Sequence, residues 1–216
     1  MIMATQIDIF NSNIAYAQAL HSSYLYFKNN NVCAIDISEL LRAEWVLIVG
    51  AMDCYIHDIV CKKMHAIITD STYNVGSLPN GLANYKMPLS SIKEIYDAVT
   101  NVEKEALLMN YLRQTLHEFS FESVQSIDSA MSYIGVKKFW SELAKEWHCD
   151  TDTIKKQLGL IVRRRNIIAH QSDIVDFTTL EKQALEAGDV EEAKNFIVRL
   201  VAYMDNRIAL QTTLFT

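Results

Sequence analysis

Apolar residues recur at steps of three and four along most of the chain, which is the spacing of one face of an α-helix. The pattern predicts helices over about 5–29, 36–69, 91–119, 126–133 and 136–147, then from about 151 and again from 189 onward. No segment shows the alternation of apolar and polar residues that is typical of a half-buried strand. We therefore expect an all-α bundle of antiparallel helices with additional short helices.

Two of these helices begin with a clear start signal. Asp36-Ile37-Ser38-Glu39 and Ser91-Ile92-Lys93-Glu94 both have the form of a capping box, in which side chains accept hydrogen bonds from the first backbone N–H groups. After the first box, apolar residues cover nearly every side of the helix around residues 45–52. We therefore expect this helix to be central and buried, with a core stripe formed by Leu41, Trp45, Ile48, Met52, Ile56 and Ile59.

The clearest break in the pattern lies at about residues 71–90. Both prolines of the chain, Pro79 and Pro88, fall here together with Gly76 and Gly81. This composition predicts a long surface loop within a single domain spanning residues 1–216. A domain boundary at this loop is the alternative.

Composition limits the possible classes of function. Half of the 216 residues are hydrophobic and the net charge is −6, so a broad basic surface that coats nucleic acid is excluded. The four cysteines form no Cys-x-x-Cys pair, and the N-terminus shows no basic region followed by an apolar run. The longest apolar run, residues 46–52, is too short to span a bilayer. We expect a cytoplasmic protein that does not associate with membranes.

The candidate chemistry lies in the run Arg163-Arg164-Arg165-Asn166-Ile167-Ile168-Ala169-His170. Arg165 falls on the same helical stripe as the apolar residues Ile154, Leu158, Ile161 and Ile168. An arginine that faces the core needs a partner, an interface or a bound anion, because an unpaired buried charge is costly.

The relative directions of the side chains indicate how such a site could be assembled. Asn166 and His170 are four residues apart and share a face, whereas Arg165 and His170 lie about 140° apart around an ideal helix. This angle favours a composite site at the seam of a dimer. The alternative without catalysis is an arginine whose charged end reaches solvent and a histidine that caps or packs.

These residue types suit RNA cleavage, because RNA carries its own nucleophile, the 2′-hydroxyl. Histidine can act as base or acid at neutral pH, and arginine presents a permanently charged fork to phosphate oxygens. Asparagine can orient the imidazole or donate to the phosphate. This chemistry requires neither a metal ion nor a cofactor.

The same residues resemble a known motif. Arg165 to His170 is similar to the Arg-x4–6-His motif of HEPN domains, in which a polar residue often follows the arginine. The run from Leu40 to Asp58 is similar to the long early helix of the RiboL-PSP-HEPN subgroup, although Gly50 and Met52 depart slightly from its usual pattern.

The resemblance implies a HEPN-like bundle and a metal-independent endoribonuclease that leaves a 2′,3′-cyclic phosphate. It implies the catalytic residues Arg165, Asn166 and His170, with RNA contacts from Arg163 and Arg164. It also implies a homodimer, and a toxin or anti-phage effector restrained by an antitoxin or another regulatory protein. The alternatives are a non-catalytic HEPN module that binds RNA or a partner protein, and a purely structural helical subunit.

Two further features lie on the predicted helix over about 36–69. Asp53 lies in an apolar stretch where a carboxylate needs a cation or hydrogen-bond donors, so we hypothesise that it orients Arg165 or His170. The alternative is an aspartate on the helix surface or one bonded to the neighbouring backbone. Cys54, His57, Cys61 and His65 share a helical stripe that resembles a metal site. They span about 16 Å along the helix, too far for one ion, and we expect no metal site.

Overall fold

A computed structural model describes residues 4–32 and 36–213 of the chain, so Cys33 lies outside the described residues. The chain divides into two compact units, one holding residues 1–55 and 150–216 and the other residues 56–149. Helices make up most of both units, which confirms the all-α prediction. The expectation of a single domain stays a prediction.

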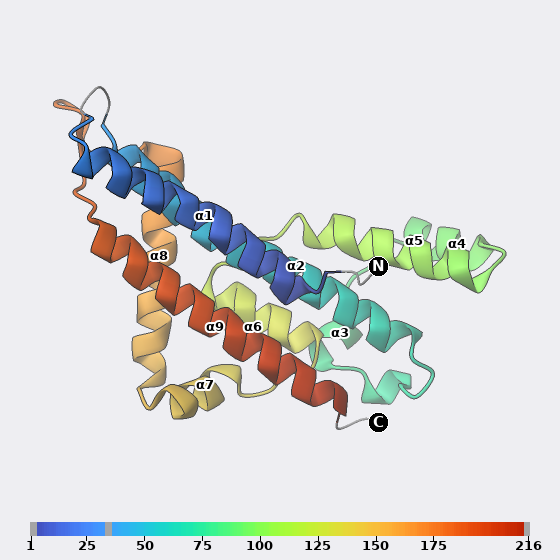
Figure 1. Ribbon diagram of the computed structural model, residues 1–216. Coiled ribbons are helices and arrows are strands. Elements are labelled where there is room, and N and C mark those ends of the chain that lie inside the picture. The colour runs from blue at the N-terminus through green and yellow to red at the C-terminus, as the bar shows by residue number, and fades with distance from the viewer. Residues whose placement is uncertain (1–3, 33–35, 214–216) are drawn as a thin grey trace. The chain divides into compact units, whose positions relative to one another are not determined.

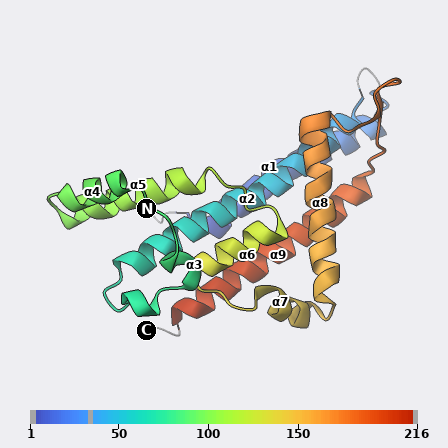
Figure 2. The ribbon, with the colours of Figure 1, turned by 180° about the vertical axis from the view of Figure 1, so that it is seen from behind.

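The first unit is built from long helices. It contains α1 (Gln6–Asn29), the first half of α2 (Ser38–Thr69), α8 (Thr151–Gln171) and α9 (Ala187–Thr213). A short hairpin of β1 (Ile174–Asp176) and β2 (Glu181–Lys182) joins α8 to α9. Figures 1 and 2 show α1 and α9 running side by side, with α8 lying across their direction.

Its core follows the predicted apolar stripes. On α2, Leu41, Ile48 and Met52 are almost completely buried, which confirms the central position expected for this helix. On α9 a second apolar stripe is buried throughout: Val190, Ala193, Ile197, Leu200, Met204 and Ile208. Each large apolar side chain buried in this way contributes about 1.5–3 kcal/mol to the free energy of folding.

Polar groups also enter this core. The Tyr55 hydroxyl donates to Asp205 Oδ1 at 2.8 Å, and burial raises the pKa of Tyr55. The Glu44 carboxylate is fully buried and its Oε2 lies 2.9 Å from His21 Nδ1. Burial raises the pKa of Glu44, although His21 and the nearby Lys194 act in the opposite direction.

The second unit holds the rest of α2 and a set of shorter elements. These are the 3-10 turn Val75–Ser77, α3 (Asn80–Ala83), α4 (Leu89–Asp97), α5 (Asn101–Leu116), α6 (Val124–Tyr133) and α7 (Phe139–Trp147). Its core includes Leu112, Phe121, Ile127, Met131 and Leu143. Gly135 has a positive φ of 78°, which turns the chain between α6 and α7 as the glycine at this position suggests.

Three details of the sequence prediction were wrong. The segment 71–90 is not a plain loop, because it contains the 3-10 turn and α3. The expected helix over 91–119 is broken into α4 and α5 at Ala98–Thr100. Val99 and Val102, two apolar residues at and just after this break, are 90% and 79% exposed. The β1–β2 hairpin was not expected, since two and three residues are too few to show an alternating pattern.

No helix within the described ranges is both long enough and apolar enough to cross a membrane.

Candidate active site

The helix α8 carries the Arg165–His170 motif, and both of its ends are well defined. At its start the Asp150 side chain accepts hydrogen bonds from the backbone N–H groups of Asp152 and Thr153, at 2.9 and 3.1 Å. At its end Ser172 and Asp173 adopt left-handed backbone conformations, with φ of 51° and 62°. The helix therefore ends at Gln171, one residue after His170, which places the imidazole on the last turn.

The three motif residues differ in their surroundings. Arg165 is partly buried, whereas Asn166 and His170 are exposed. The Arg165 guanidinium donates from Nη1 to Asn166 Oδ1 at 3.0 Å. Among the described residues the His170 imidazole makes no hydrogen bond, so its nitrogens are open to solvent and to a substrate. One chain thus joins Arg165 and Asn166 by a hydrogen bond, whereas no hydrogen bond among the described residues joins His170 to either of them.

A buried ion cluster of Arg42, Arg164 and Asp173 adjoins the motif. Asp173 is completely buried, and its Oδ2 accepts hydrogen bonds from Arg42 Nε at 2.8 Å and Arg164 Nη2 at 2.7 Å. The side chains of Arg42 and Arg164 are only 5% and 11% exposed. Two cations therefore share one carboxylate in a dry environment, where charges interact strongly and unpaired ions are costly.

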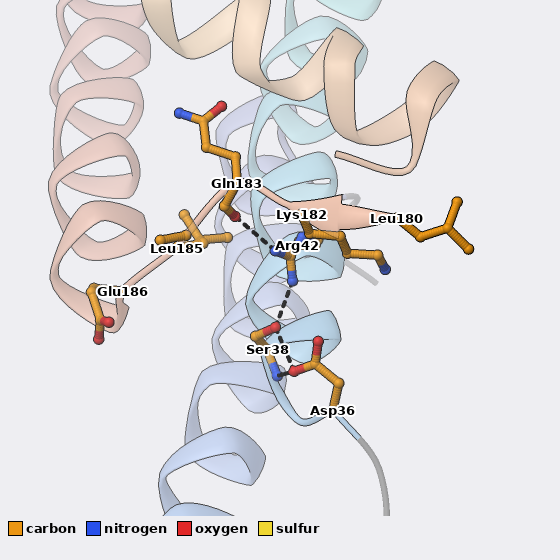
Figure 3. Close-up of a pocket in the computed structure, with 9 residues that line it drawn as sticks. Asp36, Ser38, Arg42, Leu180, Lys182, Gln183, Leu185 and Glu186 are labelled. Atoms are coloured by element: carbon orange, nitrogen blue, oxygen red, sulfur yellow. Dashed lines mark hydrogen bonds between the residues drawn. The ribbon is translucent and has the colours of Figure 1, made fainter. Parts of the chain in front are cut away.

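Both arginines also donate to backbone carbonyls of the chain between the hairpin and α9. Arg42 Nη2 donates to the Gln183 carbonyl at 2.9 Å, and Arg164 Nη2 donates to the carbonyls of Gln183 and Ala184, both at 3.2 Å. Figure 3 shows Arg42 between Ser38 on α2 and the backbone of Gln183. The cluster therefore fastens the last turn of α8 to both α2 and the chain that leads into α9.

Sequence reasoning did not find this cluster. Arg42 and Asp173 are 131 residues apart, so nothing in a single sequence pairs them. The available signal was Arg42 itself, which stands beside Leu41 and three residues before Trp45 on a buried stripe and therefore needs a counter-ion.

The structure separates the two arginines that were expected to bind RNA. Arg163 is exposed on the surface of α8, and its guanidinium can reach a phosphate. Arg164 is committed to Asp173 and to two backbone carbonyls. A phosphate contact by either arginine stays a prediction, and the geometry favours Arg163.

Asp53 lies away from the motif along α2. The indole of Trp45 donates to the Ile161 carbonyl at 3.0 Å, and Arg42 meets Arg164 at Asp173. From Ile161 toward His170, α8 therefore runs toward the Arg42 end of α2, whereas Asp53 lies about 12 Å beyond Trp45 in the other direction. These contacts give no support to an orienting role for Asp53, which stays a prediction.

The residues once considered as metal ligands have other contacts. Cys61 is buried, which raises the pKa of its thiol, and its Sγ lies 3.6 Å from Met109 Sδ. His65 Nε2 lies 3.1 Å from the Glu105 carbonyl, to which it can donate. Over the residues that the structure covers, no group of three or more His, Cys, Asp or Glu side chains could hold a metal ion.

An all-helical chain with an Arg-x4-His motif exposed on its penultimate long helix fits the HEPN class of domains. The sequence model of one family in this class, described as RiboL-PSP-HEPN, matches residues 14–210, and the chain therefore belongs to this family. Comparisons with curated proteins and with solved structures found no match.

Proposed function

We propose that this protein is a metal-independent endoribonuclease that cleaves RNA by attack of the 2′-hydroxyl, with Arg165, Asn166 and His170 as catalytic residues. The observation that carries the proposal is the end of α8, where an Arg165–Asn166 pair and an unbonded His170 imidazole are accessible together. Membership of a HEPN family supports a ribonuclease-type function.

Each side chain suits one part of the reaction. The His170 imidazole removes the 2′-hydroxyl proton or protonates the leaving 5′-oxygen, since histidine exchanges protons near neutral pH. The Arg165 guanidinium stabilises the charge that develops on the phosphate. The Asn166 amide keeps Nδ2 for the phosphate while its Oδ1 holds Arg165. The expected product is a 2′,3′-cyclic phosphate.

A composite site in a homodimer is part of the proposal. Within one chain no hydrogen bond joins His170 to Arg165 or Asn166, as far as the described residues show. Two copies related by a two-fold axis place the same surface opposite itself, so the Arg165 of one protomer can meet the His170 of its partner. The exposed Arg163 then extends the phosphate-binding surface. The protein then acts as a toxin or anti-phage effector, and an antitoxin or another regulatory protein holds its ribonuclease activity in check.

The test is cleavage of single-stranded RNA in the presence of EDTA, with end-group analysis of the products. The wild-type protein should release fragments that end in a cyclic phosphate. His170→Ala and Arg165→Ala should each lower the rate by at least about 100-fold while their thermal unfolding stays unchanged. Lys156→Ala, a change at an exposed lysine on the same helix, is the matched control and should cleave normally.

Two results would contradict the proposal. Cleavage that appears only after a divalent metal ion is added would rule out this mechanism. Binding of RNA without any cleavage by the wild-type protein would favour the alternative, a non-catalytic HEPN module.

A further inference from the structure

A groove of about 470 Å³ runs beside the motif in the first unit, between α8 and the start of α9. Its size falls in the range of pockets that bind small molecules and cofactors. Its floor is apolar and consists of Trp45, Ile161, Leu185 and Ala193, all of which are buried. Because the Trp45 indole N–H already donates to the Ile161 carbonyl, the floor offers no polar contact from that ring.

Polar side chains from both helices form the rim of the groove. Arg163 and Gln157 on α8 are exposed, as is Glu192 on the second turn of α9. Asp189 also lines the groove, but its Oδ2 accepts the Glu186 backbone N–H at 2.9 Å. Among the described residues the Glu192 carboxylate has no hydrogen-bond partner, so both of its oxygens are available to a ligand.

The groove borders the proposed catalytic residues. Ile167, which lines it, precedes His170 by three residues, and Arg163 precedes Asn166 by three. Side chains three apart on a helix are neighbours. A nucleotide whose ribose and phosphate sit at His170 can therefore place its base in the groove.

We infer that this groove binds the base of the nucleotide at the cut and that Glu192 selects guanine. The inference rests on the proposed ribonuclease function and specifies its substrate. The apolar floor suits a flat ring, while the exposed Arg163 on the rim meets the adjoining phosphate. Two carboxylates on the rim repel phosphate, so the base rather than the backbone enters.

Guanine is favoured because of the donors on its edge. Its N1–H and N2–H groups lie side by side and can both donate to a single carboxylate, as in other bidentate contacts between side chains and bases. Adenine and cytosine offer one amino group beside an acceptor, which would face the second carboxylate oxygen. Uracil offers a single N–H between two acceptors. Unmatched acceptors against a carboxylate are unfavourable.

The test measures binding first, so that it does not depend on catalysis. The full-length His170→Ala variant, which should not cut, is titrated into fluorescent single-stranded RNA pentamers with one guanosine in a uridine background. Replacing that guanosine by inosine removes only the N2 amino group and should weaken binding about tenfold. Adding Glu192→Gln should weaken guanosine binding about tenfold and abolish the difference from inosine. Glu181→Gln, at an exposed carboxylate outside the groove, is the matched control and should change neither value.

Cleavage by otherwise wild-type protein gives the second measurement. Cuts should fall next to guanosine, and Glu192→Gln should scatter them over all four nucleotides. Guanosine-dependent binding without any cleavage would uphold the groove and reject the ribonuclease. Cleavage or binding that is equal for guanosine, inosine and uridine, or no RNA binding at all, would overturn the inference.

Discussion

At the scale of single residues, the burial of Asp173 has the largest predicted consequence. Asp173→Asn removes the carboxylate that contacts both Arg42 and Arg164, and leaves only the half-exposed Glu39 beside Arg42. Two guanidinium groups would then face each other in a dry environment. We expect the free energy of unfolding to fall by about 3–5 kcal/mol, the usual cost of breaking a buried ion pair from one side. Chemical denaturation of the purified variant measures this loss.

The matched control is a second carboxylate on the same hairpin. Asp176 accepts hydrogen bonds from the Thr178 and Thr179 backbone N–H groups, and the carboxylate is solvated. Asp176→Asn keeps an oxygen in the same place and should cost less than about 1 kcal/mol. Equal losses for the two variants would show that the ion cluster does not hold the end of α8.

The sequence showed which residues of this region share a helical face, but not which buried groups pair. Asn166 and His170 were expected to share a face, and the structure shows both of them exposed on α8. The sequence pattern put Arg165 on the core-facing side of its helix, and the structure shows that the residue is partly buried. The role of Arg164 could not be seen, because its partner Asp173 turns back onto it only after the chain has left the helix in a left-handed conformation.

At the scale of elements, the Asp150 cap supports the helix that carries the proposed site. Asp150→Ala removes an acceptor for two backbone N–H groups, and we expect it to lower the free energy of unfolding by about 1 kcal/mol. The neighbouring Asp152→Ala leaves the cap in place and should cost less. Because the cap lies at the far end of α8 from His170, RNA cleavage by the folded Asp150→Ala protein should stay normal. A loss of cleavage at unchanged stability would contradict this.

The limits of prediction at this scale also have physical causes. Long helices with continuous apolar stripes, such as α2 and α9, were placed correctly because burial and periodicity agree there. The break between α4 and α5 was missed because a capping signal was not recognised. Thr100 accepts from the Glu103 backbone N–H at 3.1 Å, and the Glu103 side chain accepts from the Val99 N–H at 3.0 Å. The apolar residues on both sides of this position favour one continuous helix, whereas the N-terminal cap at Thr100 favours a new helix start. The structure shows the new helix start.

At the scale of the whole molecule, buried Glu44 links stability to pH. Because burial raises its pKa above that of the unfolded chain, Glu44 binds a proton more tightly in the folded state. The contribution of Glu44 to the free energy of unfolding is least favourable at pH values above its folded pKa. This contribution improves as the pH falls through the folded pKa. Glu44→Gln does not titrate, so the stability of the wild type relative to this variant should rise as the pH falls from neutral through the folded pKa of Glu44, toward the ordinary glutamate value of 4.5. Thermal unfolding at a series of pH values over this range measures the change.

Glu191 supplies the control for this pH effect. Its hydrogen bond from Lys194 lowers the pKa of Glu191, so its contribution is present above the unfolded pKa and is lost only at lower pH, as the pH falls through the folded pKa. The stability of the wild type relative to Glu191→Gln should therefore not rise over the same pH range. A flat difference for Glu44→Gln over this range would show that its proton is not taken up on folding.

The composite site makes the sharpest prediction about assembly, because it separates one protomer's arginine from its own histidine. Arg165→Ala and His170→Ala are each expected to be inactive. If each site takes its arginine from one protomer and its histidine from the other, a heterodimer of the two variants contains one intact site. Random mixing gives half heterodimers, so co-expression in equal amounts should restore about a quarter of the wild-type activity. Co-expression of Arg165→Ala with the double variant supplies His170 but no Arg165, so no site is complete and the mixture should stay inactive. If the first mixture also stays inactive although mass measurements show mixed dimers, each site is built within one chain.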